Sequence, residues 1–141
     1  MIRTLQQKDI DKIMEIWLES TIKAHDFIQK KYWKDNYNAV KNEYIPISKT
    51  YIYEQNGEIK GFISVLNDEF IGALFVATDC QEQGIGSALI DYAARQFPKL
   101  NLAVYKQNKK AVDFYLKKGF KIIQESPNED SGFPEYIMSN Q

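Results

Sequence analysis

A glycine-containing segment, Gln81 to Ala88, is the part of the sequence best suited to chemistry. It lies between an uninterrupted apolar run at residues 71–76 and a stretch whose apolar residues recur at helical spacing. The first amides of a helix have no partners within the helix, so they attract anions. Gly84 and Gly86 would let a pyrophosphate approach those amides closely. The segment therefore predicts a binding site for a nucleotide-like cofactor.

Two common phosphate-binding loops differ from this segment. A nucleoside-triphosphate loop needs Gly-Lys-Ser/Thr, whereas Gly86 is followed by Ser87 and Ala88. A dinucleotide fingerprint needs a third small residue where Leu89 stands, and an acidic residue about 20 positions later. The sequence there reads Leu102-Ala103-Val104. Neither of these cofactor classes is favoured.

The segment does resemble the cofactor loop of the GNAT acyltransferases, which reads Gln/Arg-x-x-Gly-x-Gly/Ala directly after a central strand. Gln81, Gly84 and Gly86 match that pattern. The family also carries an Asn and an Ala followed by Phe-Tyr-x-x-x-Gly-Phe. The matching residues here, in the same order, are Asn108, Ala111, Phe114, Tyr115, Gly119 and Phe120. Two motifs at the proper spacing argue against a chance match.

The resemblance covers the chain from about Tyr51 to Phe120, and the amino-terminal third is similar to the two-helix substrate region of the family. Within that third, residues 24–28, followed by Tyr32 and Trp33, resemble the branch of small bacterial YjaB- and YiaC-type acetyltransferases. The resemblance therefore implies a single N-acetyltransferase domain over residues 1–141. The implied reaction is direct transfer of an acetyl group from acetyl-CoA to a primary amine.

The resemblance also implies roles for individual residues. In the family, the loop amides bind pyrophosphate, the preceding strand pairs with pantetheine, and the Tyr of Phe-Tyr protonates the leaving thiolate. Tyr115 is the matching proton donor here, although helical spacing also suits a core aromatic residue. Asn108 suits a helix cap that also contacts the cofactor arm. The matching cofactor-binding residues are Leu74, Phe75, Val76, Gln81, Gln83, Gly84, Ile85, Gly86, Ser87 and Asn108.

The base that deprotonates the amine is not fixed by a motif. A lysine with a reference pKa of about 10.4 arrives mostly protonated, so something must remove a proton. Glu69, just before the apolar strand, and His25, the only histidine, are the two candidates, and a water relay is the third. Cys80 lies beside the loop without a local histidine signature, so we interpret it as a small buried residue.

The acceptor is left open by the sequence: a protein lysine, an amino terminus or a small-molecule amine would each fit. Residues 20–50 and 126–135 are where family members differ most. Aromatic residues in the first of these segments suit either an acceptor pocket or a core. Two non-enzymatic alternatives are a regulatory module that binds coenzyme A and a protein-interaction domain. Tyr115 favours the enzyme over the first of them, because a binding module needs no proton donor.

The amino-acid composition indicates which classes of partner and which cellular compartment suit the protein. With 141 residues, 44% of them apolar and 26% charged, the chain has the profile of one ordinary globular domain. A formal net charge of -1 gives no attraction for nucleic acid, and no apolar run is long enough to span a membrane. Cys80 is the single cysteine, which excludes an internal disulfide and a cysteine-based metal cluster. We therefore expect a cytoplasmic protein without nucleic acid, membrane or metal partners and leave its oligomeric state open.

The elements that position these residues follow from periodicity and turn signals. Helices are predicted from Asp9, from Trp33 to about Pro46, from Gly84 to Pro98, and from Asn108 to Lys118. Strands are predicted at 2–5, on both sides of Asn56-Gly57, and at 71–76, 100–105, 120–125 and 133–138. With the resemblance, this order predicts an α/β domain: a GNAT-like mixed, mostly antiparallel twisted sheet of about six to seven strands, with helices on both faces.

Overall fold

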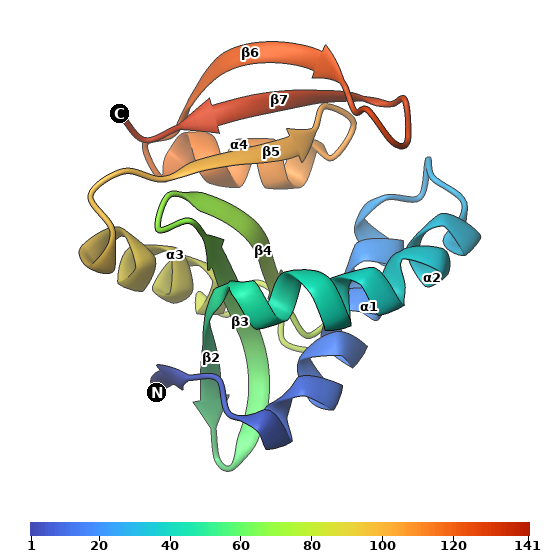
Figure 1. The fold of residues 1–141 in the computed structure, drawn as a ribbon. Helices are drawn as coiled ribbons and strands as arrows, with labels where there is room; N and C mark the ends of the chain where they lie inside the picture. Colours follow the sequence, from blue (N-terminus) through green and yellow to red (C-terminus); the bar gives the residue numbers. More distant parts are fainter.

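A seven-stranded sheet organises the molecule, with strands in the order β1-β2-β3-β4-β5-β7-β6 (Figure 1). The computed structural model describes all residues from 1 to 141. Neighbouring strands are antiparallel except β4 and β5, which run parallel. The predicted mixed, mostly antiparallel sheet is confirmed. The strands are β1 (Ile2–Thr4), β2 (Lys49–Gln55), β3 (Glu58–Leu66), β4 (Phe70–Val76), β5 (Asn101–Tyr105), β6 (Lys121–Pro127) and β7 (Pro134–Ser139).

Four α-helices cover the two faces of this sheet: α1 (Ile10–Ala24), α2 (Lys30–Ala39), α3 (Ile85–Gln96) and α4 (Lys109–Lys117). A 3-10 turn, Gln7–Asp9, precedes α1. A π-helical turn, Val40–Tyr44, and a 3-10 turn, Ile45–Ile47, extend α2 one residue beyond Pro46, where the predicted helix ends. None of the helices combines the length and the apolar character needed to cross a lipid bilayer.

Two apolar cores lie on opposite faces of the sheet, and β3 contributes to both. Phe62 packs with Trp17 of α1 in one core, whereas its neighbour Ile63 packs with Leu89 of α3 in the other. Phe62 and Ile63 are both fully buried. Because successive side chains of a strand point to opposite faces, the continuous apolar run of β3 indicates a strand covered on both sides. Helices α1 and α2 therefore cover one face and α3 and α4 the other.

Glycines shape two points of the β2–β3–β4 region. The β2–β3 hairpin turns at Asn56 and Gly57, whose φ angles of 54° and 78° are those of a two-residue turn with both residues left-handed. Gly61 is required for a different reason, because a side chain would not fit between β3 and α3. A Cβ there would lie 2.9 Å from the backbone oxygen of Phe75 and 3.3 Å from a methyl group of Leu89. Gly61 thus allows α3 to pack directly on the sheet.

The parallel contact between β4 and β5 is short. Only Phe70 and Ile71 pair with β5, opposite Asn101 and Leu102. Beyond Ile71, β4 continues to pair with β3 on its other side, and β5 pairs with β7 along its whole length. An extra residue, Gly72, interrupts the β3–β4 register at this point. The sheet therefore divides into two diverging parts, β1–β4 and β5–β7–β6, as Figure 1 shows.

Replacing Gly61 with alanine tests the close packing of α3. The added Cβ meets backbone as well as side chains, so Gly61→Ala should lower the free energy of unfolding by about 1–3 kcal/mol. Urea denaturation measures this loss. Gly86→Ala is the matched control, because a Cβ there meets its nearest neighbours at 3.7 Å, an ordinary contact distance. Equal stabilities for the two variants would contradict the assigned packing.

Candidate active site

The carboxyl-terminal half of β4 presents backbone groups to the space where β5 has diverged. The N–H of Ala77 donates to the Lys60 carbonyl of β3 at 2.8 Å, so the peptide groups of Val76, one residue earlier, face away from β3. The Val76 carbonyl accepts from side chains instead: Ser20 Oγ at 2.9 Å and Gln81 Nε2 at 3.3 Å. Leu74 shares the orientation of Val76. An extended ligand with amide groups could complete the ladder there.

The loop that follows β4 leads into the amino terminus of α3, as the sequence predicts. Gly84 is the N-cap of α3 and has a φ of 81°, a left-handed conformation that L side chains rarely adopt. No side chain caps the helix, so the amides of its first turn remain available to an anion. A Cβ on Gly84 would have no atom within 4 Å, so the space beside the loop is open.

Helix α4 brings lysines to the same helix end. Lys118 Nζ lies 2.9 Å from Ser87 Oγ in the first turn of α3 and 2.7 Å from a carboxylate oxygen of Asp91. Lys110 forms an exposed ion pair of 3.4 Å with Glu82 in the loop. These contacts tie α4 to the loop and to α3. They also place two cations beside an anion-attracting helix terminus.

The Phe-Tyr pair of α4 lies beside this loop. A Cβ on Gly86 would lie 3.7 Å from both the Phe114 ring and the Val76 side chain, so these elements of α3, α4 and β4 meet here. Tyr115 is buried, and its ring packs 5.2 Å from that of Phe114 and 5.6 Å from that of Phe120. Burial alone raises the pKa of the Tyr115 hydroxyl well above its ordinary value. Tyr115 is therefore a neutral phenol at physiological pH, able to donate a proton.

His25 and Asn108 form a second group of polar side chains. Asn108 caps α4 through Oδ1, which accepts from the Ala111 amide at 3.3 Å. The Asn108 Nδ2 atom lies 3.3 Å from His25 Nε2, and His25 Nδ1 lies 2.8 Å from the Thr21 carbonyl oxygen. Only 7% of His25 is exposed, and this burial lowers its pKa, so the ring is neutral at pH 7.

Aromatic side chains surround His25. Its ring centroid lies 5.0 Å from that of Trp33, 5.2 Å from that of Tyr105 and 5.8 Å from that of Phe27. The loop between β6 and β7 closes over this group, because Tyr32 donates to Asp130 at 2.7 Å and the hydroxyls of Tyr105 and Ser131 lie 2.9 Å apart. No local motif marks Tyr105, Asp130 or Ser131, so the sequence does not predict these contacts.

Two other residues considered in the sequence lie apart from this chemistry. Glu69 precedes β4 and pairs with Lys99 at 3.2 Å, and Val76 lies seven positions further along a nearly extended chain. At a rise of about 3.3 Å per residue, that is roughly 23 Å along the strand. The structure therefore does not bring Glu69 to the other candidates. Cys80 is buried, and burial raises the pKa of its thiol, which makes it a poor nucleophile.

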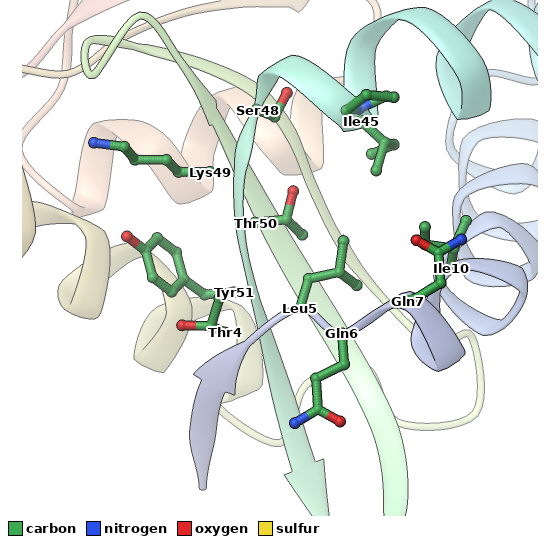
Figure 2. A pocket seen from close by; sticks show the side chains of 11 residues that line it. Thr4, Leu5, Gln6, Gln7, Ile10, Ile45, Ser48, Lys49, Thr50 and Tyr51 are labelled. Carbon is green, nitrogen blue, oxygen red and sulfur yellow. The ribbon is translucent and has the colours of Figure 1, made fainter.

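A cavity of about 520 Å³ lies elsewhere, between β1, the start of α1 and the start of β2 (Figure 2). Apart from Tyr51 and Lys49, which pairs with Asp68 at 2.7 Å, its lining has no titratable side chain. None of the candidate residues lines it. Figure 2 shows mainly neutral polar and aliphatic side chains, including those of Gln7, Ile10 and Thr50. This cavity lacks the groups that acyl transfer needs.

A divided sheet whose central strand leads through a glycine loop into a helix amino terminus, beside a buried tyrosine, has the features expected of an acyl-CoA-dependent acyltransferase. The family described as "Acetyltransferase (GNAT) domain" matches residues 19–140. The chain belongs to this GNAT acetyltransferase family, and the predicted family and enzyme class are confirmed.

Individual relatives place the chain more finely within the family. It is 37% identical over 139 residues to peptidyl-lysine N-acetyltransferase YiaC of Escherichia coli, covering 99% of this chain and 95% of YiaC. The solution structure of apo-form YjaB from Escherichia coli matches with a TM-score of 0.86 and 26% identity, over 99% of this chain and 96% of YjaB. The predicted YjaB/YiaC-type branch is confirmed.

A more distant structure supports the fold alone. PaiA N-acetyltransferase of Thermoplasma acidophilum, solved in complex with coenzyme A, has a TM-score of 0.83 and 19% identity. The match covers 100% of this chain and 98% of PaiA. The split mixed sheet with helices on both faces is thus the architecture of a known acetyltransferase.

The buried neutral His25 predicts a pH dependence of stability. Because its folded pKa lies below the unfolded value of about 6.5, the unfolded chain binds more protons as the pH falls through that value. The free energy of unfolding should therefore decrease between pH 7 and pH 5. Urea denaturation at several pH values measures this decrease, which should be smaller in His25→Gln. Parallel pH profiles for the two proteins would show that His25 makes no such contribution.

Proposed function

We propose that this protein transfers the acetyl group of acetyl-CoA directly to the ε-amine of a lysine in a protein or peptide. The observation that carries the proposal is the backbone edge of Leu74 and Val76, which leads into the open amino terminus of α3 beside Phe114, the neighbour of Tyr115. YiaC and the YjaB proteins are named peptidyl-lysine N-acetyltransferases, which favours a lysine acceptor over an amino terminus or a small-molecule amine.

Two kinds of backbone site suit the parts of acetyl-CoA. The outward-facing peptide groups of Leu74 and the N–H of Val76, whose carbonyl already accepts from Ser20 and Gln81, suit the amides of an extended pantetheine arm along Phe75. The amides at the start of α3 suit the pyrophosphate, with Lys118 nearby to balance negative charge. The remaining proposed cofactor contacts are Gln81, Gln83, Gly84, Ile85, Gly86, Ser87 and Asn108.

The chemistry requires movement of two protons. Acetyl-CoA supplies a thioester, and transfer forms a carbon–nitrogen bond while the carbon–sulfur bond breaks. Tyr115 gives its phenolic proton to the departing sulfur, a role that its place next to Phe114, which lies against Gly86 of the loop, supports. Burial keeps the phenol protonated and also makes it a weaker acid, because it raises the pKa of the hydroxyl. A non-catalytic module that binds coenzyme A would need no such donor. This favours turnover over binding alone.

The amine must also lose a proton, and we assign this step to a water relay. Glu69 lies at the opposite end of β4 in an ion pair with Lys99. The Nε2 atom of His25 is already within hydrogen-bond distance of the Asn108 amide. Neither residue has a free basic atom directed at the Val76 edge.

We further propose that the reaction takes place in the cytoplasm without nucleic acid. The supporting observations are a formal net charge of -1 and a single cysteine held as a buried thiol. A thiol without a disulfide partner suits a reducing compartment, and the absence of a net positive charge gives no attraction for nucleic acid.

Gly84→Val tests the cofactor site. Calorimetric titration should show acetyl-CoA binding to the wild type and a loss of at least about ten-fold in affinity for the variant, because the side chain fills the approach to the α3 amides. Gly57→Val is the control, since Gly57 has a similar φ of 78° and equally open surroundings, but lies in the β2–β3 turn. Both variants carry similar backbone strain. Equal loss of binding in both would trace the effect to folding and reject the site.

Tyr115→Phe tests the proton donor. Removing the hydroxyl should lower kcat by about 100-fold or more while acetyl-CoA affinity stays near that of the wild type, because the ring packing is kept. Thiol release with a lysine peptide measures the rate. Tyr51→Phe, which removes a partly buried hydroxyl from the edge of the same core, should leave the rate unchanged. If Tyr115→Phe retains wild-type activity, Tyr115 is only a core residue.

A further inference from the structure

Helix α1 crosses the place where the sheet divides and bonds to both sides of it. On one side, Ser20 Oγ donates to the Val76 carbonyl of β4 at 2.9 Å. On the other, His25, directly after the end of α1, lies 3.3 Å from Asn108 Nδ2, and Asn108 links β5 to α4. Both Ser20 and His25 are buried, with 3% and 7% of their surfaces exposed. These bonds join segments that the strands themselves do not connect beyond Ile71.

The protons of this network have one consistent arrangement. Asn108 Oδ1 accepts from the Ala111 amide, so the Nδ2 group of the same side chain must face His25. A donor at that position requires a lone pair on His25 Nε2. The ring proton is then on Nδ1, which donates to the Thr21 carbonyl oxygen at 2.8 Å. The Thr21 hydroxyl oxygen, 3.1 Å from the same Nδ1, is a second acceptor for this proton. The His25 ring therefore has partners at both nitrogens.

The surroundings of His25 leave little room for water to replace a lost partner. The rings of Phe27, Trp33 and Tyr105 pack around it, and Tyr105 is the titratable side chain among them. The Tyr105 hydroxyl is within hydrogen-bond distance of Ser131 and not directed to His25 by any bond. A side chain that cannot accept from Asn108 would therefore leave a poorly solvated amide donor, which is costly.

We infer that Ser20 and His25 are positioning residues that together form a brace across the divided sheet. The brace fixes the start of α4, and through that helix Tyr115, relative to the Val76 edge of β4. Tyr115 lies seven residues after Asn108 on a helix that rises about 1.5 Å per residue, so a shift of the cap carries to its hydroxyl. This inference rests on the proposed function, because it assigns a purpose to the spacing between two parts of that site.

A brace and a general base make different demands on residue 25. Gln can place its amide oxygen near the position of Nε2 and accept from Asn108, but it cannot act as a base. Asn is too short to reach Asn108 and instead matches the Nδ1 side of the ring. A brace role predicts that His25→Gln retains kcat within about three-fold, whereas His25→Asn loses about ten-fold or more. If Gln and Asn cause the same large loss, or neither causes any, the brace role is rejected.

The other end of the brace gives an independent check. Ser20→Ala removes the bond to Val76 without touching His25. If the two bonds act as one device, Ser20→Ala combined with His25→Asn should lower kcat no further than the more damaging single change, to within about two-fold. Losses that multiply would show two unrelated contributions and would contradict a shared brace.

Because His25 is the only histidine, NMR reads the network without any measurement of activity. Long-range proton–nitrogen spectra of the wild type should show a neutral ring with its proton on Nδ1. Asn108→Asp keeps the helix cap but replaces the donor with an acceptor, so His25 should gain a proton on Nε2 and its pKa should rise.

The NMR and kinetic results separate the two claims. A wild-type ring protonated on Nε2, or an unchanged spectrum in Asn108→Asp, would overturn the brace even if the enzyme acetylates lysine. The opposite result is also informative. If the spectra are as expected but the protein releases no thiol with any amine, the hydrogen-bond network stands and the proposed function is rejected. The role of the network in holding Tyr115 relative to Val76 is then rejected as well.

Discussion

The loss of hydrogen bonding between β4 and β5 beyond Ile71 is the constraint on which the rest of the structure depends. Unpaired backbone groups inside a sheet are costly unless something else satisfies them. Here the carbonyl of Val76 is satisfied by two side chains, and the diverging strands leave an edge in the middle of the sheet. The middle of this sheet therefore has unpaired strand backbone of the kind that other proteins expose only at an edge strand.

Packing and side-chain contacts on both faces of the sheet compensate for the missing hydrogen bonds between β4 and β5. Each face has its own apolar core, and β3 anchors both through alternate side chains such as Phe62 and Ile63. Helices α3 and α4 are tied together by Lys118, while α1 reaches both β4 and the start of α4. The two parts of the sheet can therefore remain apart without the domain losing rigidity. A ligand that lies along β4 would meet preformed donors and acceptors, so little ordering would be needed on binding.

Much of this fold could be predicted from sequence because its strongest signals are local. The Asn56-Gly57 turn, the apolar β4 run and the start of α3 at Gly84 each follow from a few neighbouring residues, and all three are confirmed. Helical spacing of apolar residues also predicts a buried Tyr115, as the structure has it. The two motifs of the family then led to the cofactor loop and to the Phe-Tyr pair.

What the sequence could not supply was contact between distant segments. His25 and Asn108 are 83 residues apart, and only the folded chain shows that the ring nitrogen and the amide face one another. Glu69 shows the opposite difficulty: it is near β4 in sequence but at the wrong end of the strand. Tyr105 and Ser131 carry no motif, since their contact depends on how the β6–β7 loop closes.

The most direct test of the divided sheet as a cofactor site is an amide NMR titration of the isotopically labelled protein with coenzyme A. The largest shifts should fall on Leu74, Val76 and the first turn of α3, with smaller ones spreading to the start of α4. Shifts confined to the cavity between β1 and β2, at residues such as Gln7 and Thr50, or no shifts at all, would contradict a cofactor site at the β4 edge.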